Sequence, residues 1–144
     1  MRFDKGKNPT ACAAKEETRY AIKGVKVVRI GEDSFIAATN GRCISFVRAW
    51  PDEDENATEV YPVEPFIAAR KAAPRGKPEV HLSLNGDARL DTGSTAQAWK
   101  ALDKRFPSVS DVIPKGKPEY TIMLSVEYLV ACAKALGCDA VQLE

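Results

Sequence analysis

Phe35–Phe46, with the sequence FIAATNGRCISF, is the stretch that decides the fold. Two apolar runs meet at Asn40-Gly41, and this dipeptide is typical of two-residue hairpin turns because both residues tolerate the positive φ angles that such turns require. The pattern predicts two antiparallel strands, Ser34–Thr39 and Arg42–Ala49. The turn between them either only reverses the chain or also forms a surface that the protein uses.

Strand-like runs continue on both sides of this hairpin. Arg19–Ile30 precedes it, and Thr58–Val63 follows it after a proline and four acidic residues. These acids, Asp52, Glu53, Asp54 and Glu55, predict a solvated loop. Further strands are expected in four segments, the first being a second hairpin that turns at Asn85-Gly86: Val80–Thr92, Ala96–Leu102, Thr121–Leu124 and Ala140–Leu143.

The spacing of prolines and apolar residues predicts two helices. Pro65 suits the first turn of one helix, and Pro74 must end it because a proline ring cannot continue a helix. The second helix begins after Ser125, a good N-cap, and ends at Gly137. Its apolar residues recur at helical spacing, which predicts a buried stripe: Val126, Leu129, Val130 and Ala133. Residues 1–18 are expected to be irregular. The resulting order of elements indicates a repeated βαβββ unit whose first copy is cut open.

The composition bounds the class of protein. A chain of 144 residues with 44% hydrophobic and 28% charged residues is expected to form one soluble globular domain, 1–144. The net charge of +1 creates no strong overall field, so a basic surface needs segregated charge. No apolar run reaches the roughly 18 residues that span a membrane. The first residues lack the core of a signal peptide, so a cytoplasmic protein is expected.

The sequence shows no set of catalytic residues. The single histidine, His81, falls on the polar face of its strand, and the paired acids lie in loops where nothing is expected to shift their pKa values. The cysteines form no CxxC motif and are expected to be buried or free thiols, with metal binding or redox use as the alternatives: Cys12, Cys43, Cys132 and Cys138. We therefore expect no enzyme, no metal and no cofactor.

Three segments carry a resemblance to a known family. They are TRYAIKGVKV at residues 18–27, AATNGRCIS at 37–45 and RFPSVSDVIP at 105–114, of which the last is the most specific. In this order and spacing they resemble motifs of the bacterial sliding clamp, the beta subunit of DNA polymerase III. The resemblance implies an α+β, DNA-clamp (processivity-factor) fold, with two helices packed on antiparallel sheets and βαβββ repeats.

The resemblance is incomplete in specific places. Asn40, Arg42 and Cys43 stand where the family has Asp, His and Arg, and Ser108-Val109 stands where it has Asp-Tyr. A clamp subunit has three such domains, whereas this chain has the length of about one. Residues 120–144 resemble the strand, helix and strand that would open the next domain, so they are expected to complete a permuted domain within the chain or by swapping. A ring of six domains would need six copies.

The resemblance also implies two binding surfaces. Clamp helices face DNA phosphates, which makes the cations at the end of the first helix candidates for weak, sequence-independent binding of double-stranded DNA: Arg70, Lys71, Arg75 and Lys77, with Lys134 on the second helix. The alternative is a helix C-terminus whose cations only complement its dipole.

The second implied surface is a groove for peptides of polymerases and repair proteins. Its matching positions are Ile22, Thr39, Gly41, Arg42, Cys43, Ile44, Pro107, Asp111 and Val112. The alternative is that these residues only pack the hairpin against the proline segment. Three functions therefore stay open: a DNA-associated clamp domain in replication or repair, a peptide-binding scaffold that no longer encircles DNA, and a small hydrolase.

Overall fold

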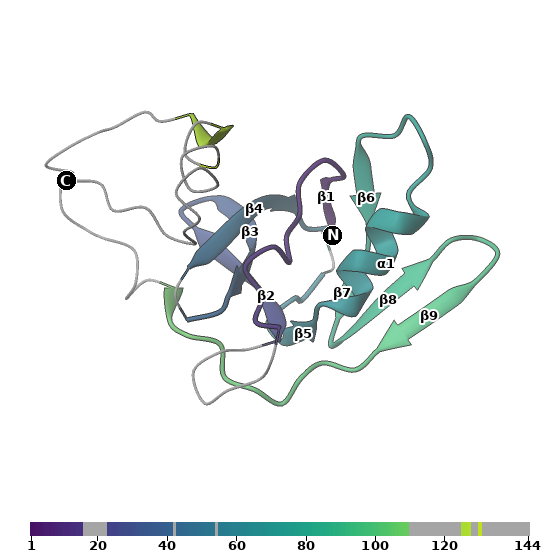
Figure 1. Ribbon diagram of the computed structural model, residues 1–144. Helices are drawn as coiled ribbons and strands as arrows, with labels where there is room; N and C mark the ends of the chain where they lie inside the picture. Colours follow the sequence, from purple (N-terminus) through teal and green to yellow (C-terminus); the bar gives the residue numbers. More distant parts are fainter. Residues whose placement is uncertain (16–22, 42, 54, 110–124, 128–129, 131–144) are drawn as a thin grey trace, which may run out of the picture. The chain divides into compact units, whose positions relative to one another are not determined.

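The computed structural model describes residues 1–15, 23–41, 43–53, 55–109, 125–127 and 130. The chain divides into two compact units, Met1–Ser110 and Asp111–Glu144. Nine strands and one helix lie in the described part of the first unit (Figure 1). They are β1 (Arg2–Asp4), β2 (Gly24–Ile30), β3 (Asp33–Thr39), β4 (Ile44–Trp50), β5 (Val60–Pro62), α1 (Glu64–Ala72), β6 (Glu79–His81), β7 (Ser83–Asn85), β8 (Asp87–Asp91) and β9 (Ala96–Trp99).

The larger sheet has six strands in the order β5-β2-β3-β4-β1-β6, and every neighbouring pair is antiparallel. The predicted hairpin forms its centre, since β3 pairs with β4 from Ser34↔Ala49 to Thr39↔Ile44. Gly41 has a φ angle of 84°, which only a glycine adopts readily. The predicted hairpin is therefore confirmed, but its turn is longer than the two predicted residues, because Thr39 pairs with Ile44 and β4 begins at Ile44 rather than at Arg42.

The two faces of this sheet differ in what covers them. Because side chains alternate along a strand, Val25, Ile36 and Ala49 lie on one face, here called the helix face. Phe66 of α1 packs in the same buried cluster as these residues, and its ring centroid is 6.1 Å from that of Phe3. The opposite face, here called the Phe106 face, carries a smaller cluster of Ala37, Val60 and Phe106.

The single described helix begins and ends where prolines predict. Pro65 occupies its first turn, and the last helical residue, Ala72, lies shortly before Pro74. Pro65, Phe66 and Ala69 are buried, whereas Ile67 is 37% exposed, so one stripe of α1 faces the core. The described residues thus contain one helix on mainly antiparallel sheet. The expected second helix and the βαβββ repeats are not confirmed.

The smaller sheet has the order β7-β8-β9. Its hairpin turns at Gly86, which has a φ angle of 74°, as the sequence predicts. However, the expected continuous strand from Val80 is interrupted at Leu82, because residues 79–81 pair with β1 in the larger sheet. Leu84, Ala88 and Leu90 point into the same cluster as Phe3 and Phe66, so both sheets share one core.

The first residues of the chain are a correction to the sequence analysis. Residues 1–18 were expected to be irregular, but Arg2–Asp4 forms β1 and lies between β4 and β6 in the larger sheet (Figure 1). Met1 and Phe3 are completely buried. The strand could not be predicted from the sequence, because three residues with polar neighbours around Phe3 are too few to show an alternating pattern.

Several other expectations concern residues outside the described part. These are the start of the strand expected at Arg19–Ile30, the strands at Thr121–Leu124 and Ala140–Leu143, and Leu129 and Ala133 of the expected second stripe. In the second unit, Val126 and Val130 are 70% and 46% exposed, and the expected packing of this stripe on a sheet stays a prediction. Among the described residues, no helix is long and apolar enough to cross a membrane.

Candidate functional site

The hairpin turn, residues Thr39–Ile44, is held by a closed set of hydrogen bonds. The Thr39 hydroxyl donates to the carbonyl oxygen of Cys43 at 2.7 Å and accepts from the backbone N–H of Gly41 at 3.1 Å. The backbone N–H of Cys43 donates to Oδ1 of Asn40 at 3.0 Å. Thr39 is buried, while Gly41 and Cys43 are exposed, so the turn presents a fixed backbone to solvent.

A second segment packs on the same face of the sheet. Ala101–Val109, here called the Phe106 segment, is joined to β5 by the hydrogen bond from Leu102 N–H to the Val60 carbonyl, at 2.7 Å. Phe106 is buried against Ala37 and Val60 and is flanked by half-buried apolar residues: Val28, Phe46, Leu102 and Val109. Pro107 directly follows Phe106 and is exposed.

The structure places five of the nine predicted groove residues. Thr39 and Ile44 face each other across β3 and β4 and, by strand alternation from Ala37, lie on the Phe106 face. Gly41, Cys43 and Pro107 are exposed, and Ile44 is half-buried. The other four lie outside the described residues: Ile22, Arg42, Asp111 and Val112. The turn and the Phe106 segment thus share one face of the larger sheet.

The predicted basic cluster, Arg70, Lys71, Arg75 and Lys77, lies at the C-terminal end of α1, which packs on the helix face. Arg70 is half-buried and donates from Nε to the backbone oxygen of Lys5 at 3.3 Å. Lys71, Arg75 and Lys77 are exposed. Lys5 adds a cation that sequence reasoning missed, since its Nζ donates to the carbonyls of Ala73 and Pro74 at 2.7 and 3.1 Å. Lys134 lies outside the described residues.

Sequence reasoning also missed an ammonium cluster, formed by Met1, Asp52, Glu55 and His81. The buried α-ammonium of Met1 pairs with Glu55 at 2.6 Å and with Asp52 at 2.8 Å. His81 Nε2 lies 2.9 Å from Asp52 Oδ2. The acidic loop is therefore not only solvated, as was expected, because the Glu55 side chain is 4% exposed and also accepts from the Leu84 N–H at 2.6 Å. In the sequence, only an acidic run combined with a buried N-terminus could have indicated the ammonium cluster.

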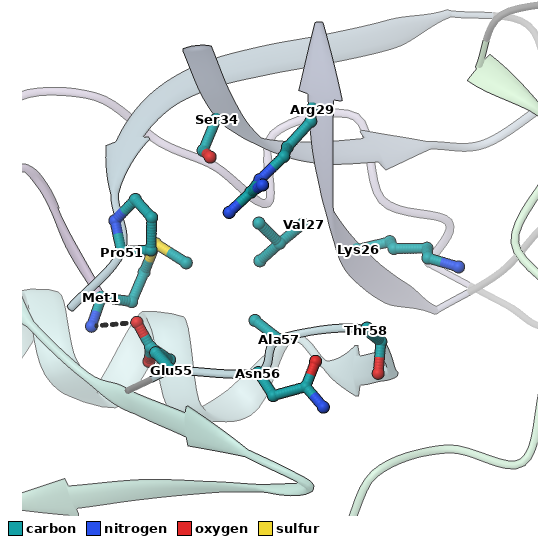
Figure 2. Close-up of a pocket in the computed structure, with 10 residues that line it drawn as sticks. All are labelled: Met1, Lys26, Val27, Arg29, Ser34, Pro51, Glu55, Asn56, Ala57 and Thr58. Atoms are coloured by element: carbon teal, nitrogen blue, oxygen red, sulfur yellow. Dashed lines mark ion pairs between the residues drawn. The ribbon is translucent and has the colours of Figure 1, made fainter. Parts of the chain in front are cut away.

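A half-open cavity of about 440 Å³ lies beside this cluster (Figure 2). Figure 2 shows Glu55 and Met1 at one end, Val27 and Ala57 in the middle, and the Arg29 side chain reaching in from β2. None of the five groove residues that the structure describes lines it. The described residues contain no group of three or more His, Cys, Asp and Glu side chains that could hold a metal ion.

The ammonium cluster changes the acid–base behaviour of Asp52. A hydrogen bond from the Met1 α-ammonium, and then one from His81, lower the pKa of Asp52 from 3.8 to about 2. This corrects the expectation that nothing in the loop shifts a carboxyl pKa. Because the folded-state pKa is below the ordinary value, the Asp52 carboxylate stabilises the fold above about pH 4 and loses this effect as the pH falls toward about 2.

An Asp52→Asn variant tests this dependence. We expect the variant to be less stable than the wild type at neutral pH and the difference to shrink between about pH 4 and about pH 2, where the wild-type carboxylate takes up its proton. Urea denaturation at a series of pH values measures both curves. Glu53→Gln, an exposed acid in the same loop, should give no such convergence. A difference that stays constant down to about pH 2 would contradict the role of Asp52.

The fold is that of a sliding-clamp-like domain. The structure is similar to Caulobacter crescentus pol III beta, with a TM-score of 0.60 and 23% sequence identity over 81% of this chain and 35% of that one. It is equally similar to the C. crescentus beta sliding clamp with polyethylene glycol bound to the region proposed for beta-motif tethering, with a TM-score of 0.61 and 23% identity over 81% and 34% of the two chains.

The likeness to these structures is one of fold. The chain spans about a third of the length of both clamps, which agrees with the expectation of one clamp domain. No family model and no curated protein sequence matches the chain. The resemblance drawn from the three sequence segments is thus confirmed at the level of a clamp-like domain.

Proposed function

We propose that this chain is a non-enzymatic, sliding-clamp-like domain that associates with DNA and tethers partner proteins in replication or repair. The observation that supports this most is the separation of two surfaces by the larger sheet. The basic cluster lies at the C-terminal end of α1, which packs on the helix face, while the turn and the Phe106 segment lie on the opposite face. A protein that holds DNA on one side and a peptide on the other needs this arrangement.

The DNA-facing role rests on cations that are free to reach phosphates. Lys71, Arg75 and Lys77 are exposed and belong to none of the ion pairs found among the described residues. Phosphate contacts need positive charge but no base readout, so the expected binding is weak and independent of sequence. The helix dipole also favours these cations, which is the competing explanation for their position.

The peptide-facing role rests on the apolar and polar groups of the Phe106 face. Half-buried Ile44 offers an apolar contact, and the exposed turn at Gly41 adds polar backbone. Such a mixture suits an apolar peptide side chain fixed by a few polar contacts. We include Ile22, Arg42, Cys43, Pro107, Asp111 and Val112 in this proposed groove, and we propose that residues 120–144 complete the domain within the chain or between chains.

A triple variant tests the DNA-associated function. Replacing Lys71, Arg75 and Lys77 with Ala should weaken binding to a labelled DNA duplex and reduce the slope of log affinity against log salt by about 0.9 for each lost phosphate contact. Arg70 is left in place because it bonds to the Lys5 backbone. Fluorescence anisotropy at several salt concentrations gives both slopes, and light scattering reports whether six copies assemble.

The matched control replaces three exposed cations elsewhere in the first unit: Lys15, Lys100 and Arg105. It removes the same charge, so its salt slope should stay close to that of the wild type. Equal slopes for both variants would mean that the basic cluster only complements the helix dipole and does not contact DNA. Absence of duplex binding at low salt, with a short apolar peptide still bound, would identify the alternative, a peptide-binding scaffold with the clamp fold.

A further inference from the structure

The half-open cavity of about 440 Å³ beside the ammonium cluster, here called the Arg29 cavity, contains a charge without a partner (Figure 2). Arg29 takes part in no ion pair or hydrogen bond within the residues that the structure describes. The other two charges that face the cavity neutralise each other, since the Glu55 carboxylate lies 2.6 Å from the Met1 α-ammonium. The cavity therefore carries one uncompensated positive charge, which favours an anion.

The alternation of side chains along β2 decides which cation points into the cavity. Arg29 follows Val27 in the row of side chains on the helix face. Lys26 also lines the cavity, but it pairs with Ala37 and therefore belongs to the Phe106 face. Figure 2 accordingly shows the Arg29 side chain reaching inward and the Lys26 ammonium pointing away from it. A single guanidinium thus supplies the positive charge, which suits a ligand with a single negative charge.

Ser34 adds a polar group next to Arg29. The two residues pair across β2 and β3, and the Ser34 hydroxyl points into the cavity (Figure 2). Ser34 is only 6% exposed, and its hydroxyl makes no hydrogen bond to any described residue. It is therefore available as a donor to an oxygen atom in the cavity. A guanidinium with a hydroxyl beside it offers several N–H and O–H donors, which suit the two oxygens of a carboxylate.

Small apolar groups form the rest of the cavity wall. Val27 and Ala57 lie in its middle, and Pro51 and the Met1 side chain lie near them (Figure 2). None of the lining residues is aromatic, so the cavity offers no ring on which a nucleobase could stack. Its volume falls within the roughly 300–1,000 Å³ that is usual for small-molecule sites. The walls therefore suit a short aliphatic group.

We propose that the Arg29 cavity binds a small carboxylate with a short aliphatic body. The carboxylate pairs with the Arg29 guanidinium and accepts a hydrogen bond from Ser34, while the body packs against Val27 and Ala57. A dianion such as inorganic phosphate fits less well, because one cation faces the cavity and Glu55 repels a second negative charge. Neither the basic cluster nor the described groove residues line this cavity, so the proposal does not rest on the proposed function.

A ligand in this cavity contacts two segments that are separated in the sequence. Val27 and Arg29 belong to β2, whereas Pro51 and Ala57 belong to the loop between β4 and β5. The site exists only when these segments are folded together, so the ligand binds the folded chain and not the unfolded one. Binding should therefore raise the melting temperature, and the rise should grow with the concentration of the carboxylate.

An NMR titration of the isotope-labelled full chain tests the site at constant pH and ionic strength. The probes are isovalerate, its neutral amide isovaleramide, acetate and inorganic phosphate. Isovalerate should cause a saturable shift of the Arg29 Nε–H signal, which is assigned by its absence from the spectrum of Arg29→Gln. Acetate lacks the aliphatic body and isovaleramide lacks the charge, so each should bind at least roughly tenfold more weakly. Phosphate should also bind more weakly than isovalerate.

Three variants supply the controls, with the rise in melting temperature as the measurement. Arg29→Gln should weaken isovalerate binding by roughly 10- to 100-fold, and Ala57→Leu, which fills the cavity but keeps the charge, should also weaken it. Arg105→Gln removes an exposed arginine elsewhere and should leave the affinity unchanged. The comparison of probes on the wild type needs no variant to fold.

Four results would overturn the proposal. They are the absence of a saturable shift with isovalerate, equal binding of isovalerate and isovaleramide, binding of phosphate at least as tight as that of isovalerate, and an equal loss of affinity in Arg105→Gln and Arg29→Gln.

Discussion

Replacing Glu55 with Gln should lower the free energy of unfolding by about 3–5 kcal/mol, the range typical of a buried ion pair that loses one partner. The Glu55 carboxylate lies 2.6 Å from the Met1 α-ammonium, and the side chains of the two residues are 4% and 0% exposed. Gln can still accept a hydrogen bond from Leu84 N–H, but it cannot neutralise the ammonium. The lost stability therefore reflects mainly the buried Met1 charge, whose remaining partner among the described residues is the half-exposed Asp52.

Urea denaturation of the chain that begins at Met1 provides this measurement. The matched control is Glu53→Gln, which makes the same chemical change at an exposed position in the same loop and should alter stability by less than about 0.5 kcal/mol. Equal effects of the two substitutions would show that the ammonium cluster contributes no more than ordinary loop charge.

Replacing Phe66 with Ala should be similarly severe, with a cost of about 3–5 kcal/mol. Phe66 is completely buried on α1, and its ring lies against that of Phe3 with a centroid distance of 6.1 Å and an interplanar angle of 45°. Removing the ring leaves a cavity where α1, β1 and the smaller sheet meet. Since a typical domain is stable by roughly 5–15 kcal/mol, the variant should be marginally folded.

The next residue in the helix supplies the control for this substitution. Ile67→Ala makes a comparable truncation on the same helix, but Ile67 is 37% exposed and should cost far less. Thermal melting followed by circular dichroism compares the two variants. A smaller loss for Phe66→Ala than for Ile67→Ala would mean that α1 does not pack through Phe66.

The parts of the fold that were predicted correctly depend on neighbours in the sequence. Asn40-Gly41 and Asn85-Gly86 each set a turn between runs that pair with each other directly, and Pro65 and Pro74 bound α1 within a few residues. In these cases the residues that carry the pattern also make the contacts. Local chemistry is then enough to define the element.

The parts that were missed depend on distant partners. β1 is only three residues long, and it is a strand because β4 and β6 provide edges on both sides. Glu55 is buried because the N-terminus reaches it from far along the chain. Likewise, the strand from Val80 breaks at Leu82 because β6 and β7 belong to different sheets. No pattern within a short window reports such contacts.

The candidate groove could also be predicted only in part. Thr39, Ile44 and the Phe106 segment lie on one face of the larger sheet, and the groove that the family motifs indicate there stays a prediction.

The position of β1 also constrains how the chain is made. Phe3 of β1 pairs with Ala49 of β4 on one side and with Val80 of β6 on the other. β1 is therefore made before both of its partners, and β6 is the last of them to be synthesised. At roughly 5–20 residues per second, a ribosome needs about 4–15 s to add the residues between Phe3 and Val80. Until β6 is made, one edge of β1 has no partner, and an unpaired edge can join another chain. The nascent protein is therefore most prone to aggregation just before β6 emerges.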